Sequence, residues 1–177
     1  MANSTKFKGS PVKIAGEFIA AGAKAPNFSL TKGDLGHFTL ADGKGKKLLL
    51  NIFPSIDTPV CAITVRKFNE LAAKMKNTLV LCISKDLPFA QGRFCGAEGL
   101  KNVVTLSDFH YSSHFGEDYG VLMTDSPLSG LLARAVVIID ETGKVIYSEL
   151  VSDIVNEPDY DKALNALGAA PGQTCGL

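Results

Sequence analysis

The sequence has no excess of charge of either sign, because its 18 lysine and arginine residues equal its 18 aspartate and glutamate residues in number. This balance excludes the broad positive field that draws many proteins to nucleic acids or anionic membranes. Long apolar runs are also missing: the stretch at residues 135–139 falls far short of the ~20 residues that a membrane-spanning helix needs. We therefore expect a protein that binds neither nucleic acid nor a membrane.

Signals for export and for common cofactors are missing too. The first ten residues lack the continuous apolar segment and the cleavage site of a secretory signal, which predicts a cytoplasmic protein. No G-x-G-x-x-G or P-loop pattern follows a candidate strand. His37, His110 and His114 form no zinc-ligand spacing with a pair of cysteines, and we expect His110 and His114 to make polar contacts in loops. We therefore expect that the protein needs neither a metal nor an organic cofactor.

Only four cysteines occur in the 177 residues, too few for a scaffold of disulfide bonds. In a reducing compartment, cysteines indicate reactivity, metal binding or burial, and the surroundings of each decide between these. Cys82 lies within the apolar run at residues 79–84, so we expect it in the core. Cys175 lies beyond the last expected helix and is expected to be exposed. Cys61 and Cys95 remain as candidates for chemistry.

The hydrophobic pattern predicts alternating strands and helices in a single domain of residues 1–177. Strands are expected at 6–8 and 12–15, a hairpin turned at 9–11, and at 48–53, 79–84, 103–106, 135–140 and 144–149. Helices are expected at 59–75, 88–95 and 159–167. The last two strands are joined by only Glu141, Thr142 and Gly143, too few residues for a crossover. This order predicts an α/β protein with a thioredoxin-like fold, which has a mixed central sheet, helices on both faces and an N-terminal β-hairpin.

The stretch FPSIDTPVC at residues 53–61 lies where a buried strand ends and an amphipathic helix begins. Thr58 suits the N-cap and Pro59 the first helical position, so Cys61 falls at the third. Free backbone amides and the positive end of the helix dipole favour the thiolate there, which is the nucleophilic form of cysteine. We predict that the Thr58 hydroxyl accepts a bond from a backbone amide while donating to the sulfur or to an oxygen of the molecule that the sulfur attacks. Pro54 is expected to shield the pocket from water.

A simpler interpretation of Cys61 stays open on these observations. Its spacing from Val65 and Phe68 places it on the apolar face of the same helix. Free cysteines are commonly buried as small apolar residues, so position alone does not establish reactivity.

Two segments resemble a known family. The pattern Pro54-x-x-x-Thr58-x-x-Cys61 resembles the active-site signature of peroxiredoxins, and SKDLPFAQGRFC at residues 84–95 resembles the resolving-cysteine region of bacterial thiol peroxidases. The resemblance runs through nearly the whole chain. It implies that Cys61 is the peroxidatic residue and Cys95 the resolving residue.

The resemblance also implies a reaction cycle. The Cys61 thiolate attacks a hydroperoxide and becomes a sulfenic acid. Cys95 then condenses with it to form an intrachain disulfide, which thioredoxin reduces by exchange. Because the two cysteines lie on different predicted helices, we expect the first turn around Cys61, the helix of Cys95, or both to unwind. Gly92, Gly96 and Gly99 ease this unwinding.

Arg134 matches the arginine that lies beside the peroxidatic sulfur in this family. With the backbone amides of the helix start, it is expected to offset the charge that develops on the leaving oxygen. Without the resemblance, the favoured interpretation is a surface ion pair with Asp108, Glu117 or Asp125.

Further expectations concern substrate, assembly and rival functions. The resemblance implies a homodimer and small apolar hydroperoxides as substrates, whose approach is lined by Phe53, Ile56, Val60 and Phe94. One rival is a thioredoxin-like disulfide oxidoreductase, but such enzymes carry C-x-x-C where this chain has Thr58-Pro59-Val60-Cys61. Another is a redox sensor or holdase that is oxidised once and does not turn over.

Overall fold

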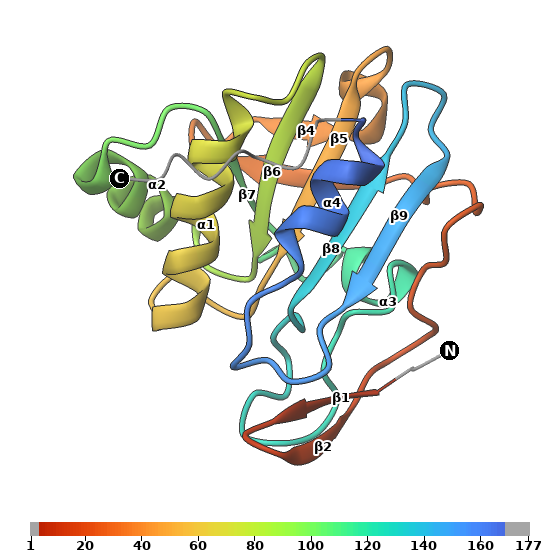
Figure 1. The fold of residues 1–177 in the computed structure, drawn as a ribbon. Coiled ribbons are helices and arrows are strands. Elements are labelled where there is room, and N and C mark those ends of the chain that lie inside the picture. Colours follow the sequence, from red (N-terminus) through yellow and green to blue (C-terminus); the bar gives the residue numbers. More distant parts are fainter. Residues whose placement is uncertain (1–3, 169–177) are drawn as a thin grey trace, which may run out of the picture.

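A computed structural model describes residues 4–168 of the chain (Figure 1). Its main feature is a seven-stranded sheet with the order β4-β3-β7-β6-β5-β8-β9. The strands are β3 (Ser29–Lys32), β4 (His37–Thr39), β5 (Lys47–Ile52), β6 (Thr78–Ser84), β7 (Val104–Ser107), β8 (Ala135–Ile139) and β9 (Val145–Leu150). The three central strands β5, β6 and β7 are parallel, and the outer strands pair antiparallel with their neighbours. The expected mixed sheet is confirmed.

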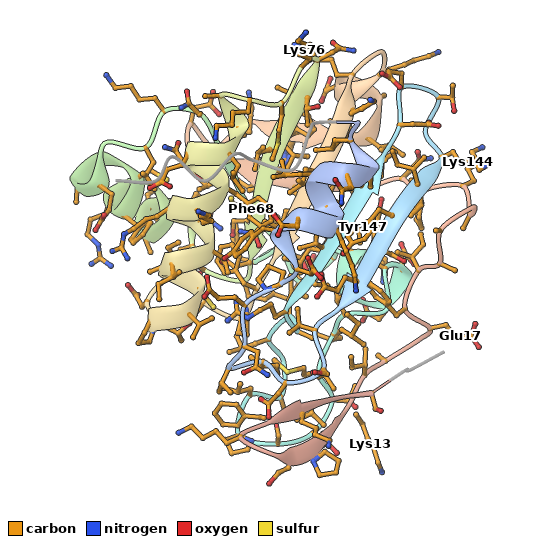
Figure 2. All side chains as sticks on the ribbon, viewed as in Figure 1. Lys13, Glu17, Phe68, Lys76, Lys144 and Tyr147 are labelled. Atoms are coloured by element: carbon orange, nitrogen blue, oxygen red, sulfur yellow. The ribbon has the colours of Figure 1, made fainter. Side chains whose placement is uncertain are left out.

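Helices cover both faces of this sheet. They are α1 (Pro59–Ala72), α2 (Pro88–Glu98), α3 (Phe115–Asp118) and α4 (Tyr160–Ala166), with a 3-10 turn η1 at Leu40–Gly43. Figure 1 shows α1 and α4 side by side over one face, with α3 behind the sheet. The ring of Phe68 in α1 contacts that of Tyr160 in α4, with centroids 5.1 Å apart, and Figure 2 shows Phe68 between these helices.

The run of buried residues in β5 contributes side chains to a hydrophobic core on each face of the sheet. Leu48, Leu50 and Ile52 pack into the core on the α3 face, whereas Leu49 and the following residue Phe53 pack beneath α1 and α4. A strand that is buried on both faces needs apolar side chains at successive positions, which is why its pattern is continuous and not alternating.

The N-terminal hairpin lies apart from the main sheet and consists of β1 (Ser4–Phe7) and β2 (Ser10–Lys13). The predicted turn at 9–11 begins one residue and ends two residues too late, because Phe7 pairs with Ser10 and leaves only Lys8 and Gly9 in the turn. Both have positive φ, 51° and 83°, as a two-residue hairpin turn of type I′ requires. Pro11 therefore lies within β2.

Four short elements were not predicted: β3, β4, η1 and α3, which have three or four residues each. The remaining predicted elements are confirmed, with differences at their ends. The largest differences are in α1, which ends at Ala72, and in α2, which continues to Glu98.

Candidate functional site

Cys61 lies at the start of α1, as the sequence predicts. Thr58 is the N-cap with extended backbone angles, Pro59 is the first helical residue and Cys61 is the third. The Cys61 side chain is 0% exposed and is a free thiol that packs with Phe53 and Val65. The positions required by both interpretations, the reactive and the buried cysteine, are therefore met, because Cys61 lies on the apolar face of the helix and also at its N-terminus.

Arg134 lies against this sulfur. Its Nη2 donates to the Cys61 Sγ at 3.2 Å, and its Nε donates to the carbonyl of Ile154 at 2.8 Å. The side chain is only 1% exposed, and no ion pair within residues 4–168 includes it. The alternative of a surface ion pair is therefore wrong. A guanidinium is costly to bury without a partner, and the Cys61 sulfur accepts one of its hydrogen bonds here.

Sheet register brings Arg134 to Cys61 across 73 positions of sequence. In the antiparallel pairing of β5 with β8, Ile52 lies opposite Ala135. Arg134 therefore lies beside Phe53, at the edge of the sheet where the chain turns towards α1. The Nη1 of Arg134 is also buried, and it has no hydrogen-bond partner in the described part of the chain. It is a donor available to an oxygen of a bound molecule.

The N-terminal hairpin contributes to the position of Arg134. Ile154, whose carbonyl accepts from Arg134, donates its own N–H to the carbonyl of Lys6 in β1 at 2.8 Å. The Lys6 N–H donates to the carbonyl of Ser152 at 3.0 Å, and the buried Thr5 hydroxyl donates to the carbonyl of Val151 at 2.7 Å. Strand β1 thus holds the segment that orients the guanidinium.

The hydroxyl of Thr58 makes a different bond from the one expected. It donates to the carbonyl of Ser55 at 2.9 Å, and it caps no amide of α1. The Thr58 N–H donates to the same carbonyl at 3.1 Å, so both groups close a tight turn at residues 55–58. Pro54 is buried as expected. A bond from Thr58 to the sulfur or to a peroxide is not formed in this structure and stays a prediction for the reacting complex.

The sequence reasoning missed a carboxylate at this site, that of Asp86. It accepts hydrogen bonds from the Ser55 hydroxyl at 2.8 Å, the Ile56 N–H at 2.7 Å and the Ser84 hydroxyl at 2.6 Å. A signal was available, because Asp86 lies two residues after the predicted strand at 79–84, and this strand is parallel to the one that leads to Cys61. Loops at the carboxyl ends of neighbouring parallel strands meet at one edge of a sheet.

Cys95 lies on α2, separate from α1, and is also a free thiol. It is half-buried, and burial raises the pKa of its thiol. The helix that carries it is held to α1 at the surface: the Arg66 guanidinium forms two hydrogen bonds with the Glu98 carboxylate, at 2.8 and 2.9 Å. The same guanidinium lies 5.5 Å from the ring centroid of Phe94. The described structure thus has both candidate thiols reduced and on different helices.

Cys82 is a core residue, as expected. It is fully buried beneath α1, and the Asn51 side chain donates to its sulfur at 3.7 Å. Burial raises the pKa of the Cys82 thiol to about 12, which keeps it protonated and unreactive at neutral pH. Cys175 lies outside the described residues.

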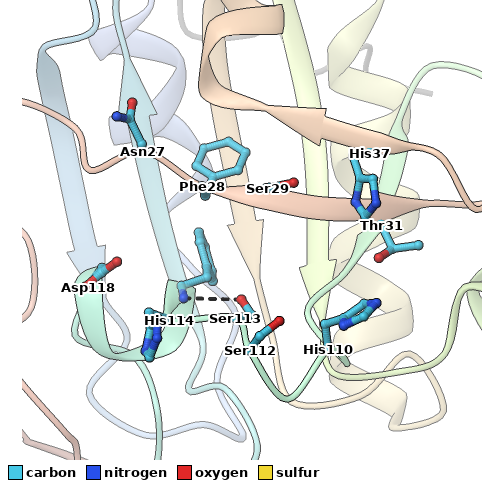
Figure 3. Close-up of a pocket in the computed structure, with 11 residues that line it drawn as sticks. Asn27, Phe28, Ser29, Thr31, His37, His110, Ser112, Ser113, His114 and Asp118 are labelled. Carbon is cyan, nitrogen blue, oxygen red and sulfur yellow. Dashed lines mark hydrogen bonds between the residues drawn. The ribbon is translucent and has the colours of Figure 1, made fainter.

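All three histidines line a cavity of about 360 Å³ against β3, β4 and α3 (Figure 3). His110 and His114 lie in the segment that follows β7, whereas His37 is the first residue of β4 and not a loop residue. Within residues 4–168, no group of three or more His, Cys, Asp or Glu side chains is arranged to hold a metal ion. None of the helices described there is long and apolar enough to cross a bilayer.

Comparison with known proteins gives matches over most of the chain. The Redoxin family matches residues 20–164. The thiol peroxidase of Corynebacterium glutamicum is 55% identical over 163 residues, which cover 92% of this chain and 98% of that protein. The thiol peroxidase of Mycobacterium tuberculosis is 57% identical over 163 residues, covering 92% and 97% of the two chains.

Solved structures agree with the predicted fold class. A peroxiredoxin-like protein from Aquifex aeolicus superposes with a TM-score of 0.89 at 42% identity, covering 95% of this chain and 97% of the other. The thiol peroxidase from Chromobacterium violaceum shares the fold, with a TM-score of 0.85 at 23% identity over 93% and 95% of the chains. The thioredoxin-like arrangement is therefore confirmed.

Proposed function

Because the chain belongs to the thiol peroxidases of the Redoxin family, we propose that it reduces hydrogen peroxide and organic hydroperoxides, with Cys61 as the nucleophile. The observation that carries this proposal is the contact between the Cys61 sulfur and the guanidinium of Arg134, 3.2 Å apart and both buried. A fixed cation beside the sulfur favours the thiolate, which is the form that attacks peroxides.

In the first step, the Cys61 thiolate attacks the terminal oxygen of the hydroperoxide. A sulfur–oxygen bond forms, the oxygen–oxygen bond breaks, and the leaving oxygen takes a proton from solvent to become water or an alcohol. The sulfur is oxidised by two electrons to a sulfenic acid, and the peroxide is reduced by two. The unpaired Nη1 of Arg134 can donate to the leaving oxygen as its negative charge develops.

In the second step, the Cys95 thiol attacks the sulfenic sulfur of Cys61. Water leaves, and an intrachain disulfide between the two residues is formed. A thioredoxin-type dithiol then reduces this disulfide by exchange, with the mixed disulfide as intermediate. Cys61 is completely buried at the start of α1 and Cys95 lies on α2, so this step requires local unwinding of one or both segments.

Small apolar hydroperoxides are the proposed substrates. Phe53 and Ile56 are buried in the same cluster as Cys61, and the ring of Phe94 packs against its edge. An alkyl or fatty-acid chain would find apolar side chains on its way to the sulfur, whereas a charged substrate would lose its hydration there without compensation.

We further propose that residues 1–177 act as one domain in the cytoplasm and that two copies form a homodimer. Support for the dimer comes from four exposed apolar side chains: Leu87, Phe89, Phe109 and Tyr111. They follow the neighbouring parallel strands β6 and β7, so they lie at one edge of the sheet. Sedimentation of the parent protein and of Phe89→Glu tests this, because the charge should yield monomers.

A redox sensor that uses the same cysteines is the second candidate function. Turnover separates it from a peroxidase: when coupled to thioredoxin, an enzyme consumes many equivalents of hydroperoxide, whereas a sensor stops after one. The disulfide is tested by treating reduced protein with one equivalent of cumene hydroperoxide and mapping linked peptides by mass spectrometry. Cys61→Ser and Cys95→Ser serve as controls, and a different pairing in the parent would contradict the proposed cycle.

A further inference from the structure

The carboxylate of Asp86 holds the loop at residues 54–58, which leads into α1. Its Oδ1 accepts from the hydroxyl of Ser55, and its Oδ2 accepts from the backbone N–H of Ile56, at 2.8 and 2.7 Å. Hydrogen bonds to a carboxylate are roughly twice as strong as bonds between neutral groups. One side chain thus fixes two consecutive residues of this loop.

The loop transmits this hold to Cys61. The carbonyl of Ser55 accepts hydrogen bonds from both the N–H and the hydroxyl of Thr58, the N-cap of α1. The carbonyl of Thr58 in turn accepts from the N–H of Ala62 at 3.1 Å, within the first helical turn. A shift of Ser55 would therefore displace the turn that aligns the Cys61 sulfur with Arg134.

Asp86 is itself anchored to the sheet. Its carbonyl accepts a hydrogen bond from the hydroxyl of Ser107 in β7, and its Oδ2 accepts from the hydroxyl of Ser84 in β6. Two residues further on, at Pro88, α2 begins and leads to Cys95. Asp86 thus lies between the segments that carry the two thiols, and it joins the first of them to a fixed part of the structure.

We propose that Asp86 is a positioning residue that favours attack on peroxide and opposes formation of the disulfide. The inference rests on the proposed peroxidase cycle. While the three hydrogen bonds are intact, the first turn of α1 keeps Cys61 buried against Arg134, which is the geometry of the first step. Unwinding of that turn pulls on the loop that Asp86 holds, so the same bonds resist the second step.

A chemical consequence follows for oxidation by excess peroxide. A sulfenic acid that waits longer for Cys95 has more time to meet a second hydroperoxide molecule, which oxidises it to sulfinic acid. Asp86 therefore increases the fraction of chains lost to sulfinic acid at high peroxide concentration. Its removal should protect the protein from this loss even as it slows the first step.

The experiment compares the parent with Asp86→Asn and Ser55→Ala. Peroxide attack is measured by competition with a peroxidase of known rate, and disulfide formation by quenched flow with mass spectrometry of Cys61–Cys95 peptides. For Asp86→Asn we expect attack to slow about tenfold, the size of losing charged hydrogen bonds, and disulfide formation to accelerate. Ser55→Ala removes one of these hydrogen bonds, so it should also slow peroxide attack and accelerate disulfide formation, but by a smaller factor. This variant provides the test if Asp86→Asn does not fold.

The matched control is Asp140→Asn. The carboxylate of Asp140 also accepts three hydrogen bonds, from Thr142 and Lys144 in the β8–β9 turn, at the opposite end of β8 from Arg134. It should leave both rates and the sulfinic fraction at parental values. If both rates fall together in Asp86→Asn and Ser55→Ala, or if neither changes, the role assigned to Asp86 is overturned. Failure of the parent itself to form the Cys61–Cys95 disulfide would instead reject the proposed cycle.

Discussion

The two segments that carry the candidate thiols are built in opposite ways. Cys61 is fully buried, at the start of a helix whose apolar face packs on the sheet, and a buried guanidinium lies against its sulfur. Cys95 lies half-buried on α2, a helix whose buried residues are only Pro88 and Gln91. Attack on peroxide benefits from fixed geometry, whereas a disulfide between distant helices needs a segment that opens at low cost. We infer that the first segment supplies the precision of the cycle and the second much of its movement.

Replacing Arg134 is expected to have the largest effect on this comparison. Arg134→Met keeps much of the side-chain volume but removes the cation beside the sulfur and the donor to the leaving oxygen. Loss of one such preorganised donor costs about 100-fold in rate or more, so peroxide attack should fall at least that far. Competition kinetics measures this, with the exposed Lys144→Gln as control. An Arg134→Met protein that retains the parental rate would remove the basis of the proposed mechanism.

Stiffening α2 is expected to slow the second step alone. Gly92 and Gly96 have open space for a methyl group, and Ala in place of Gly stabilises a helix interior by about 1 kcal/mol per site. The double variant should therefore form the disulfide up to about 30-fold more slowly, if α2 opens during resolution, without change in peroxide attack.

A substitution at the end of the same helix should change the rate of disulfide formation in the opposite direction. Gly99 ends α2 with a φ of 66°, a left-handed conformation that costs any other residue free energy. Gly99→Ala should destabilise the last turn and accelerate the disulfide. Quenched-flow measurements that show equal rates in the Gly92/Gly96 and Gly99 variants would place the movement in α1 alone.

A smaller effect is expected in the pH dependence of Cys95 alkylation. Since burial raises the pKa of this thiol, the folded protein holds less thiolate than an unfolded chain at the same pH. In Cys61→Ser protein, alkylation of Cys95 should thus continue to accelerate with pH above about 8.5, where alkylation of the urea-unfolded chain levels off. Peptide mass spectrometry after timed addition of iodoacetamide measures both rates. Matching profiles would mean that α2 does not restrain the thiol.

Replacing Cys82 should have the smallest effect of these substitutions on the rates of the two steps. The cycle does not use this residue, and the raised pKa keeps its thiol protonated. Cys82→Ala should consequently leave the rates of both steps within about twofold of the parent, despite some loss of stability from the smaller side chain. A larger drop in the rate of disulfide formation would show that a third thiol takes part.

The parts of the site that could be predicted are those fixed by neighbouring residues. Thr58 and Pro59 define a helix start within a few positions, so the place of Cys61 follows from local chemistry. Arg134 required the family resemblance, because the register of two strands, and no local signal, brings it to the sulfur. Asp86 was missed because its partners are a backbone amide and hydroxyls, which leave no pattern of spacing, so that only its place after a predicted strand pointed to it.

The same contrast holds for the fold. Strands β5, β6 and β8 carry continuous apolar runs and helix α1 carries a helical apolar period, so all four were found, with differences of one to three residues at their ends. Strands β3 and β4 and helix α3 are too short for a period to emerge, and they form because the larger elements leave an edge or a face to cover. Tertiary context, which a single sequence does not display, decides such elements.

The hydrogen bonds between β1 and the segment at residues 151–154 have a practical consequence for the use of this protein. Trimming the first nine residues would leave the seven-stranded sheet in place. It would, however, remove the Lys6 carbonyl that accepts from the Ile154 N–H, and so release the residue whose carbonyl orients Arg134. A shortened chain should accordingly melt as a well-folded protein while working as a poor catalyst. For fusion and immobilisation, we therefore expect that an intact hairpin is needed for full activity.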